Sequence, residues 1–167
     1  MSHLKPTEPG KAPAADAPDY ALLAAQLREL QSADAHYVPL MANLSALLWE
    51  ALPDVNWAGF YVMRGGALVL GPFQGRAACI HIEVGRGVCG TAVLEERVQR
   101  VDDVHAFPGH IACDSASSSE IVLPIRSGGR IAAVLDIDSP LPGRFTESDE
   151  LGLRALVSAL EENIIFA

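Results

Sequence analysis

The chain has little positive charge. Its 12 Lys and Arg residues stand against 21 Asp and Glu residues, which gives a formal net charge of -9. The basic residues form no run anywhere in the sequence. Nucleic acids and anionic membrane surfaces both bind clustered positive charge, so the composition argues against either partner. A small polar or cationic ligand suits this chain better.

Long apolar runs are also missing. None approaches the roughly 20 residues that a bilayer crossing needs, and the N-terminus lacks the apolar core and small-residue cleavage site of an export signal. We therefore expect a soluble, cytoplasmic protein. Structural disulfides are rare in a reducing cytoplasm, so its three cysteines are expected to be core residues, metal ligands or catalytic thiols.

The cysteines lack the spacing of a metal site. Cys79, Cys89 and Cys113 lie in three separate segments, and no two of them form a C-x-x-C pair. A zinc site would have to combine them with a histidine from the same part of the chain: His81, His105 or His110. The missing C-x-x-C pair argues against that site and leaves redox chemistry or simple burial.

The length and composition predict one domain. A chain of 167 residues that is 50% hydrophobic can bury one good core, which we place in residues 18–167. Residues 1–17 are rich in Pro, Ala, Lys and Asp and show no apolar periodicity. We expect them to form a disordered or loosely docked arm.

Helical periodicity marks both ends of this domain. Apolar residues at helical spacing predict one helix from about Pro18 and a second, after residues 32–34, that ends near Leu52. Near the C-terminus, Thr146 and Asp149 have the spacing of a capping box, and the helix that follows is predicted to reach the terminus. These helices enclose a strand-rich middle.

That middle predicts a sheet of about six strands. Two of them, 57–63 and 67–73, form a hairpin about the turn 64–66, and the others are expected at 78–83, 98–101, 120–126 and 130–138. A short helix is expected at 89–97 and a long loop at 102–119. The order indicates an α+β fold: a central antiparallel sheet with the terminal helices on one face and a loop-covered pocket on the other.

Three acids are predicted to share one face of this sheet. Alternation along residues 130–138 puts Asp136 and Asp138 opposite the apolar face that carries Ile131, Ala133, Leu135 and Ile137. A three-residue loop at 127–129 would then pair Glu120 with Asp136. Like charges so close are unfavourable unless a cation lies among them or one carboxyl keeps its proton. We therefore expect a binding site; the alternative is a solvated outer face.

An aromatic pair is expected beside these acids. Trp57 and Tyr61 share one face of the first strand, with Gly59 between them as an open shelf. Such a shelf near carboxylates suits a ligand with an ammonium group and a polarizable end. The alternative is an ordinary aromatic pair in the core.

Each cysteine segment admits a functional and a structural interpretation. The run Gly85–Gly90 matches G-x-G-x-x-G, but the helix after it is too short for a dinucleotide-binding crossover. It would instead bring Cys89 to a helix N-terminus, which favours a thiolate; the alternative is a small buried cysteine. Cys79 could equally be a buried strand residue. Cys113 lies in a polar loop, a position that often carries chemistry.

Four segments together resemble the free methionine-R-sulfoxide reductases, which are GAF-domain enzymes. The similarity runs from about Tyr20 to the C-terminus and includes each cysteine in its own motif. The segments are Gly71-Pro72-Phe73-Gln74-Gly75, Gly85-Arg86-Gly87-Val88-Cys89-Gly90-Thr91-Ala92, Gly109-His110-Ile111-Ala112-Cys113-Asp114 and Ser119-Glu120-Ile121-Val122-Leu123-Pro124.

The resemblance implies a role for each candidate residue. Cys113 would be the nucleophile, and Cys79 or Cys89 would resolve its oxidised form. The substrate methyl end would contact Trp57 and Tyr61, and the substrate would be held and its sulfoxide polarised by three acids, Glu120, Asp136 and Asp138. The resemblance also implies a homodimer and thioredoxin as reductant.

This chemistry needs no metal or organic cofactor. A thiolate attacks the sulfoxide sulfur while a carboxyl group with a raised pKa protonates the oxygen. The resulting sulfenic acid condenses with a second thiol to a disulfide that an external reductant opens. The acids would also neutralise the free α-ammonium, which a protein-bound methionine lacks. The alternative is a non-catalytic GAF sensor of a small molecule or of redox state.

Overall fold

A computed structural model describes residues 17–110 and 115–167 of the chain. Within these residues a six-stranded antiparallel sheet has the strand order β3-β2-β1-β6-β5-β4. The strands are β1 (Trp57–Arg64), β2 (Ala67–Gly75), β3 (His81–Glu83), β4 (Gln99–Val101), β5 (Ser119–Ser127) and β6 (Arg130–Ser139). The helices are α1 (Tyr20–Ala33), α2 (Tyr37–Ala51), α3 (Gly87–Glu95), the 3-10 helix η1 (Val104–Ala106) and α4 (Glu147–Glu161).

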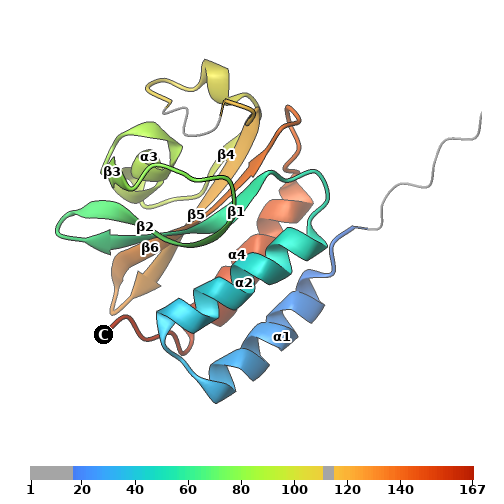
Figure 1. Ribbon diagram of the computed structural model, residues 1–167, viewed down its shortest axis with the longest axis vertical. Coiled ribbons are helices and arrows are strands. Elements are labelled where there is room, and N and C mark those ends of the chain that lie inside the picture. The colour runs from blue at the N-terminus through green and yellow to red at the C-terminus, as the bar shows by residue number, and fades with distance from the viewer. Residues whose placement is uncertain (1–16, 111–114) are drawn as a thin grey trace, which may run out of the picture.

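The two faces of the sheet are covered differently (Figure 1). Helices α2 and α4 pack on one face with α1 against them, and their apolar side chains meet Ala58 and Phe60 of β1 in the larger core. On the other face α3 packs with Trp57 and Tyr61 in a smaller core. This arrangement confirms the predicted α+β fold.

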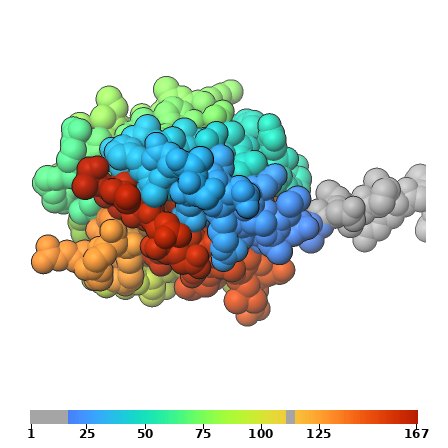
Figure 2. Space-filling view, turned by 90° about the horizontal axis from the view of Figure 1, so that it is seen from below, coloured from blue at the N-terminus to red at the C-terminus, as the bar shows by residue number. Residues whose placement is uncertain are grey.

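The helix starts follow the local sequence. Asp19 caps α1 by accepting a hydrogen bond from the Leu22 N–H at 2.9 Å. The capping box of Thr146 and Asp149 is present at the start of α4, as predicted. Helix α4 ends at Glu161 and not at the terminus, and the last residues cross back to α2. Figure 2 shows α1, α2 and this C-terminal segment side by side on the helical face.

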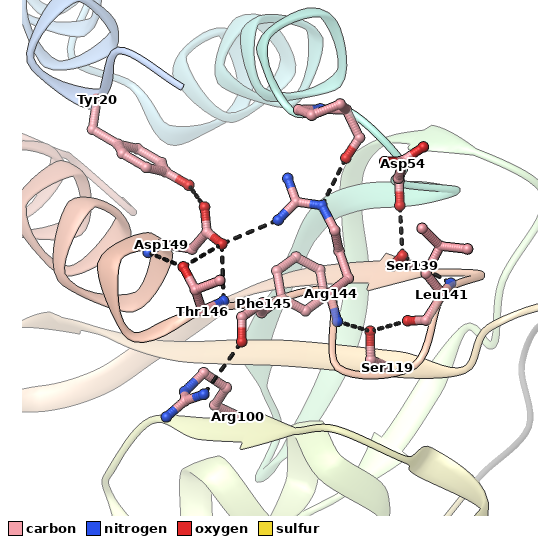
Figure 3. Close-up of polar contacts among 11 residues, drawn as sticks. Tyr20, Asp54, Arg100, Ser119, Ser139, Leu141, Arg144, Phe145, Thr146 and Asp149 are labelled. Carbon is pink, nitrogen blue, oxygen red and sulfur yellow. Dashed lines mark hydrogen bonds and ion pairs between the residues drawn. The ribbon is translucent and has the colours of Figure 1, made fainter. Parts of the chain in front are cut away.

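A buried polar network ties the helices to the sheet (Figure 3). The Tyr20 hydroxyl of α1 donates to the Asp149 carboxylate of α4 at 2.7 Å, and Arg144 forms an ion pair with the same carboxylate at 3.0 Å. Arg144 also donates to the Pro53 carbonyl at 2.9 Å, just before β1. Nearby, the Ser119 hydroxyl donates to the Leu141 carbonyl at 2.6 Å. These bonds fix the ends of the strands that carry the acids.

The hairpin of β1 and β2 confirms one prediction, whereas that of β5 and β6 corrects another. Gly65 and Gly66 make a tight turn with φ of 61° and 85°, values that glycine adopts readily. In the second hairpin the loop is two residues long, because Ser127 pairs with Arg130. Ala132 is an extra residue in β6, since Arg126 pairs with Ile131 but Ile125 pairs with Ala133.

The predicted register of this second hairpin is therefore wrong. Glu120 pairs with Asp138, and Val122 pairs with Asp136. A two-residue loop alone would place the acids of β5 and β6 on opposite faces of the sheet. The extra residue at Ala132 shifts the register by one more position, so the acids still share one face. It also turns Ile131, which we expected beside Ala133, toward the smaller core.

Other differences concern the segments around the cysteines. Strand β3 is confined to His81–Glu83, so Cys79 lies in the connection from β2 and not in a strand. Helix α3 begins at Gly87 and ends at Glu95, two residues earlier at each end than predicted. The expected arm, except Ala17, and the predicted nucleophile Cys113 lie outside the described residues. In the parts described, no helix has the length and apolar character that a membrane crossing requires.

Candidate active site

A cavity of about 40 Å³ lies on the sheet face that α3 covers. It brings together six of the predicted site residues: Trp57, Tyr61, Cys89, Glu120, Asp136 and Asp138. They come from β1, α3, β5 and β6, so distant parts of the sequence meet here. The other lining residues are Ala77, Ala78, Ile82, Arg86, Gly87, Val88, His110 and Ser117.

The acids form a buried wall of this cavity. Glu120 and Asp136 are each 6% exposed, which excludes the solvated outer face that was the alternative. Burial, and then the charges of Asp136 and Asp138, raise the pKa of Glu120 well above its ordinary value. Burial also raises the pKa of Asp136 to about 6, against hydrogen bonds with Cys89 and Glu120 that lower it. Burial and the neighbouring carboxylates therefore favour the protonated form of Glu120.

One oxygen of this wall lacks a partner. Within residues 17–110 and 115–167, the buried Oδ1 atom of Asp136 accepts no hydrogen bond. A buried polar atom without a partner is uncommon in a folded protein and calls for an explanation. The atom belongs to a residue that lines the cavity, so a ligand with a positive charge or a donor group can satisfy it.

Cys89 is a free, buried thiol beside the acids. Its Sγ lies 3.9 Å from Glu120 Oε1, a distance at which the thiol can donate a weak hydrogen bond. Burial, followed by the charges of Asp136 and Glu120, raises the pKa of the thiol well above its ordinary value. The expectation that the start of α3 favours a thiolate is wrong, because burial and neighbouring carboxylates oppose ionisation more strongly.

The aromatic pair lines the cavity, but it leaves no open shelf. The rings of Trp57 and Tyr61 lie 5.9 Å apart, and Phe73 stacks on Trp57 at 5.2 Å. A Cβ atom on Gly59 would collide with the Cβ and Cα atoms of Phe73 and with the Trp57 ring, so these groups already fill the expected gap. Glycine is required here for close packing, and the buried aromatic pair lines one side of the cavity.

Polar bonds hold the aromatic pair to the segment that carries Cys79. The Trp57 indole N–H donates to the Arg76 carbonyl at 3.1 Å, and the Tyr61 hydroxyl donates to the Cys79 carbonyl at 3.0 Å. Burial and the nearby Asp136 raise the pKa of Tyr61, so its hydroxyl keeps the proton that this bond uses. Cys79 itself is half-buried and disulfide-bonded.

This disulfide bears on the zinc site weighed from the sequence. A disulfide sulfur is not a thiolate ligand, so Cys79 cannot contribute to a zinc site in this form. Of the three candidate histidines, His110 lines the cavity. Burial, and then the neighbouring His105, lower the pKa of His110 and favour its neutral form.

Arg86 and Ser117 are lining residues that sequence reasoning missed. Arg86 precedes α3 in the Gly85–Gly90 run, and its side chain makes no hydrogen bond or ion pair with the described parts of the protein. The sequence signal that could have identified Arg86 is its place in the same Gly85–Gly90 run as Cys89. Ser117 is 4% exposed and accepts a hydrogen bond from Asn56 Nδ2 at 3.2 Å. It lies in the connection between η1 and β5, outside any helix or strand, so no periodicity could place it.

The whole domain is similar to known proteins. Residues 40–164 match the GAF domain family. The free methionine-R-sulfoxide reductase (fRMsr) of Escherichia coli K12 is 57% identical over 143 residues, which cover 86% of this chain and 87% of that protein.

Two solved structures of substrate complexes are also similar. The fRMsr of Staphylococcus aureus in complex with substrate has a TM-score of 0.84 and 47% identity, covering 89% of this chain and 97% of its own. The free methionine-R-sulfoxide reductase from Neisseria meningitidis in complex with its substrate has a TM-score of 0.84 and 41% identity, with coverage of 91% and 92%. The chain therefore belongs to the free methionine-R-sulfoxide reductase family of GAF-domain proteins.

Proposed function

We propose that this protein reduces free methionine-R-sulfoxide to methionine by thiol chemistry, with Cys113 as nucleophile, Cys79 as resolving cysteine and thioredoxin as reductant. The observation that carries the proposal is the wall of buried acids, in which burial and the charges of Asp136 and Asp138 raise the pKa of Glu120 and favour its protonated form. A sulfoxide oxygen must be protonated as its bond to sulfur breaks, and a neutral carboxyl group can supply that proton.

Recognition of a free amino acid follows from the charges around the cavity. Asp136 and Asp138 attract the α-ammonium group, and the unpartnered Oδ1 of Asp136 is one acceptor for it. Trp57 and Tyr61 contact the S-methyl end. Arg86, the arginine of the lining, attracts the α-carboxylate. A methionine within a polypeptide has neither charge, so the protein discriminates against it.

The first chemical step uses one proton. The Cys113 thiolate attacks the sulfoxide sulfur, and Glu120 transfers its proton to the oxygen. The oxygen moves to Cys113, methionine leaves with a reduced thioether sulfur, and Cys113 becomes a sulfenic acid. Solvent reprotonates Glu120 before the next turnover.

The second step closes a disulfide. The thiol of Cys79 attacks the sulfenic acid, and water leaves. Two observations support Cys79 in this role: Cys79 is disulfide-bonded, and Cys89 is free. In the proposed reaction the disulfide joins Cys79 to Cys113. Thioredoxin then reduces this disulfide by thiol exchange.

Cys89 has a different role in this proposal. A resolving cysteine attacks as a thiolate, and the raised pKa of Cys89 keeps that form scarce. As a neutral thiol it donates to Glu120 and keeps the acid wall from carrying another negative charge. We therefore propose that Cys89 holds the acids in position.

The test is a turnover assay with matched substrates. The reduced protein is incubated with free L-methionine-R-sulfoxide, with the S diastereomer and with a peptide that contains methionine sulfoxide, using thioredoxin or dithiothreitol as reductant. We expect methionine from the free R form alone. If no methionine forms although thiol titration shows reduced cysteines, the protein is a sensor and the proposal fails.

Cysteine variants separate the roles. Cys113→Ser should abolish even a single turnover, whereas Cys79→Ser should allow one methionine per chain and then stop when thioredoxin is the reductant. The homodimer implied by the family resemblance is a further part of the proposal, and light scattering of the purified protein gives its mass.

A further inference from the structure

The acid wall and Cys89 have the composition of a metal site. Ligand atoms of Cys89, Glu120 and Asp136 all lie within 4.8 Å of one another, and all three residues are buried. They belong to α3, β5 and β6, which pack together in the core of the domain. The cluster differs from the zinc site weighed from the sequence, because one cysteine and two carboxylates replace the set of three cysteines.

The Oδ1 atom of Asp136 independently points to a cation. It is buried and accepts no hydrogen bond from the residues that the structure describes. A carboxylate oxygen taken out of water without a donor is costly, and an ion within bonding distance removes that cost. Asp136 is 6% exposed, so bulk water does not satisfy this atom.

The dimensions suit a small ion. Tetrahedral zinc with a sulfur ligand at about 2.3 Å and an oxygen ligand at about 2.0 Å places these two atoms roughly 3.5 Å apart. Cys89 Sγ and Glu120 Oε1 lie 3.9 Å apart, so a small adjustment closes the ligand set. His110 lines the same cavity but is not among the residues whose ligand atoms lie within 4.8 Å of one another, so a set of three protein ligands leaves the fourth position to water.

We propose that Cys89, Glu120 and Asp136 form a binding site for a borderline-soft divalent cation, of which Zn²⁺ is the natural example. On binding, the thiol of Cys89 and the carboxyl of Glu120 release their protons to solvent, and no oxidation or reduction occurs. The bound ion takes the place of the substrate ammonium group at Asp136. This competition alone rests on the proposed function, whereas the binding itself does not.

Cobalt provides a spectroscopic test of the ligands. The oxidised protein is used, in which Cys79 is disulfide-bonded and Cys89 is a free thiol. Titration with Co²⁺ should give one equivalent bound with a sulfur-to-cobalt charge-transfer band, and Zn²⁺ should remove that band. Cys89→Ser should abolish the band, while Glu120→Gln and Asp136→Asn should each weaken binding by about 10- to 100-fold.

A matched surface variant and thermal unfolding curves control the experiment. Glu83→Gln removes an exposed acid of β3 outside the cavity and should bind Co²⁺ like the parent protein. A folded Cys89→Ser variant that keeps its charge-transfer band overturns the site. A parent protein that gives no charge-transfer band also overturns the site. The same holds if Glu120→Gln and Asp136→Asn both bind Co²⁺ like the parent protein.

The competition has its own control. Free methionine-R-sulfoxide should displace Co²⁺ from the protein, whereas the S diastereomer, which chelates free metal equally well, should not. Equal displacement by both diastereomers overturns the shared position of ion and substrate. This measurement needs no turnover, so loss of catalysis and loss of metal binding are observed separately.

Discussion

Replacing Glu120 by glutamine should remove the proton donor of the proposed reaction without changing the shape of the side chain. Glu120 is 6% exposed, and burial together with the nearby charges of Asp136 and Asp138 favours the protonated form of its carboxyl group. General acid catalysis typically contributes about 10²- to 10⁴-fold to a rate, so kcat/KM should fall by that factor. The assay is NADPH consumption coupled to thioredoxin and its reductase.

The pH profile distinguishes loss of the donor from general damage. In the parent protein the rate should fall as pH rises through the raised pKa of Glu120, because the proton is lost. That descending limb should disappear in Glu120→Gln, leaving only the rise that reports formation of the Cys113 thiolate. A variant that keeps the parent rate, or that keeps the descending limb, would refute Glu120 as the donor.

Stability provides a second check with a definite sign. A carboxyl group whose pKa is raised by folding binds its proton more tightly in the folded state. Its contribution is therefore most favourable below the ordinary pKa of glutamic acid and is lost as pH rises through the folded value. Glu120→Gln should gain stability relative to the parent protein as pH rises from 4 to 8. Denaturant unfolding curves recorded at steps of about one pH unit measure this difference.

Three further predictions concern other residues. Cys89→Ser should still close the disulfide and be recycled by thioredoxin, whereas Cys79→Ser should not, and gel shifts with a thiol-alkylating reagent after one turnover decide between them. Arg86→Gln should raise KM for the free sulfoxide about tenfold, the effect of losing roughly 1.4 kcal/mol, with little change in kcat. Gly152→Ala should destabilise the fold by about 1–3 kcal/mol in urea unfolding, because the new Cβ meets the Tyr20 ring; unchanged stability would contradict this packing argument.

Much of the fold follows from periodicity in the sequence. The helical stripes and the Thr146 capping box predict the helices because both depend on residues a few positions apart. The hairpin at Gly65 follows from two adjacent glycines that can adopt positive φ. The extent of β3 could not be predicted, since it depends on which part of the chain reaches the edge of β2.

The site could be predicted in its members but not in its detailed geometry. Alternation along β6 places Asp136 and Asp138 on the same face of the sheet. Glu120 shares that face in every register that differs from the observed one by an even number of residues. The two-residue loop and the bulge at Ala132 each shift the pairing by one residue from the predicted register, and the bulge has no signature in the sequence. The protonation of Cys89 likewise depends on burial by α3 and on carboxylates from two other strands.

The neutral state of Cys89 and Glu120 explains how an acidic wall can be buried without a permanent cation. Three carboxylates and a thiolate in one cavity would repel one another, so burial leaves protons on the thiol and on Glu120. Among the described residues of this cluster, Asp136 is the one with a carboxylate oxygen, Oδ1, that accepts no hydrogen bond. An incoming ammonium group pairs with that charge, while the proton on Glu120 stays available for the sulfoxide oxygen. In the proposed reaction, the positive charge that identifies a free amino acid thus completes the same cluster that supplies the catalytic proton.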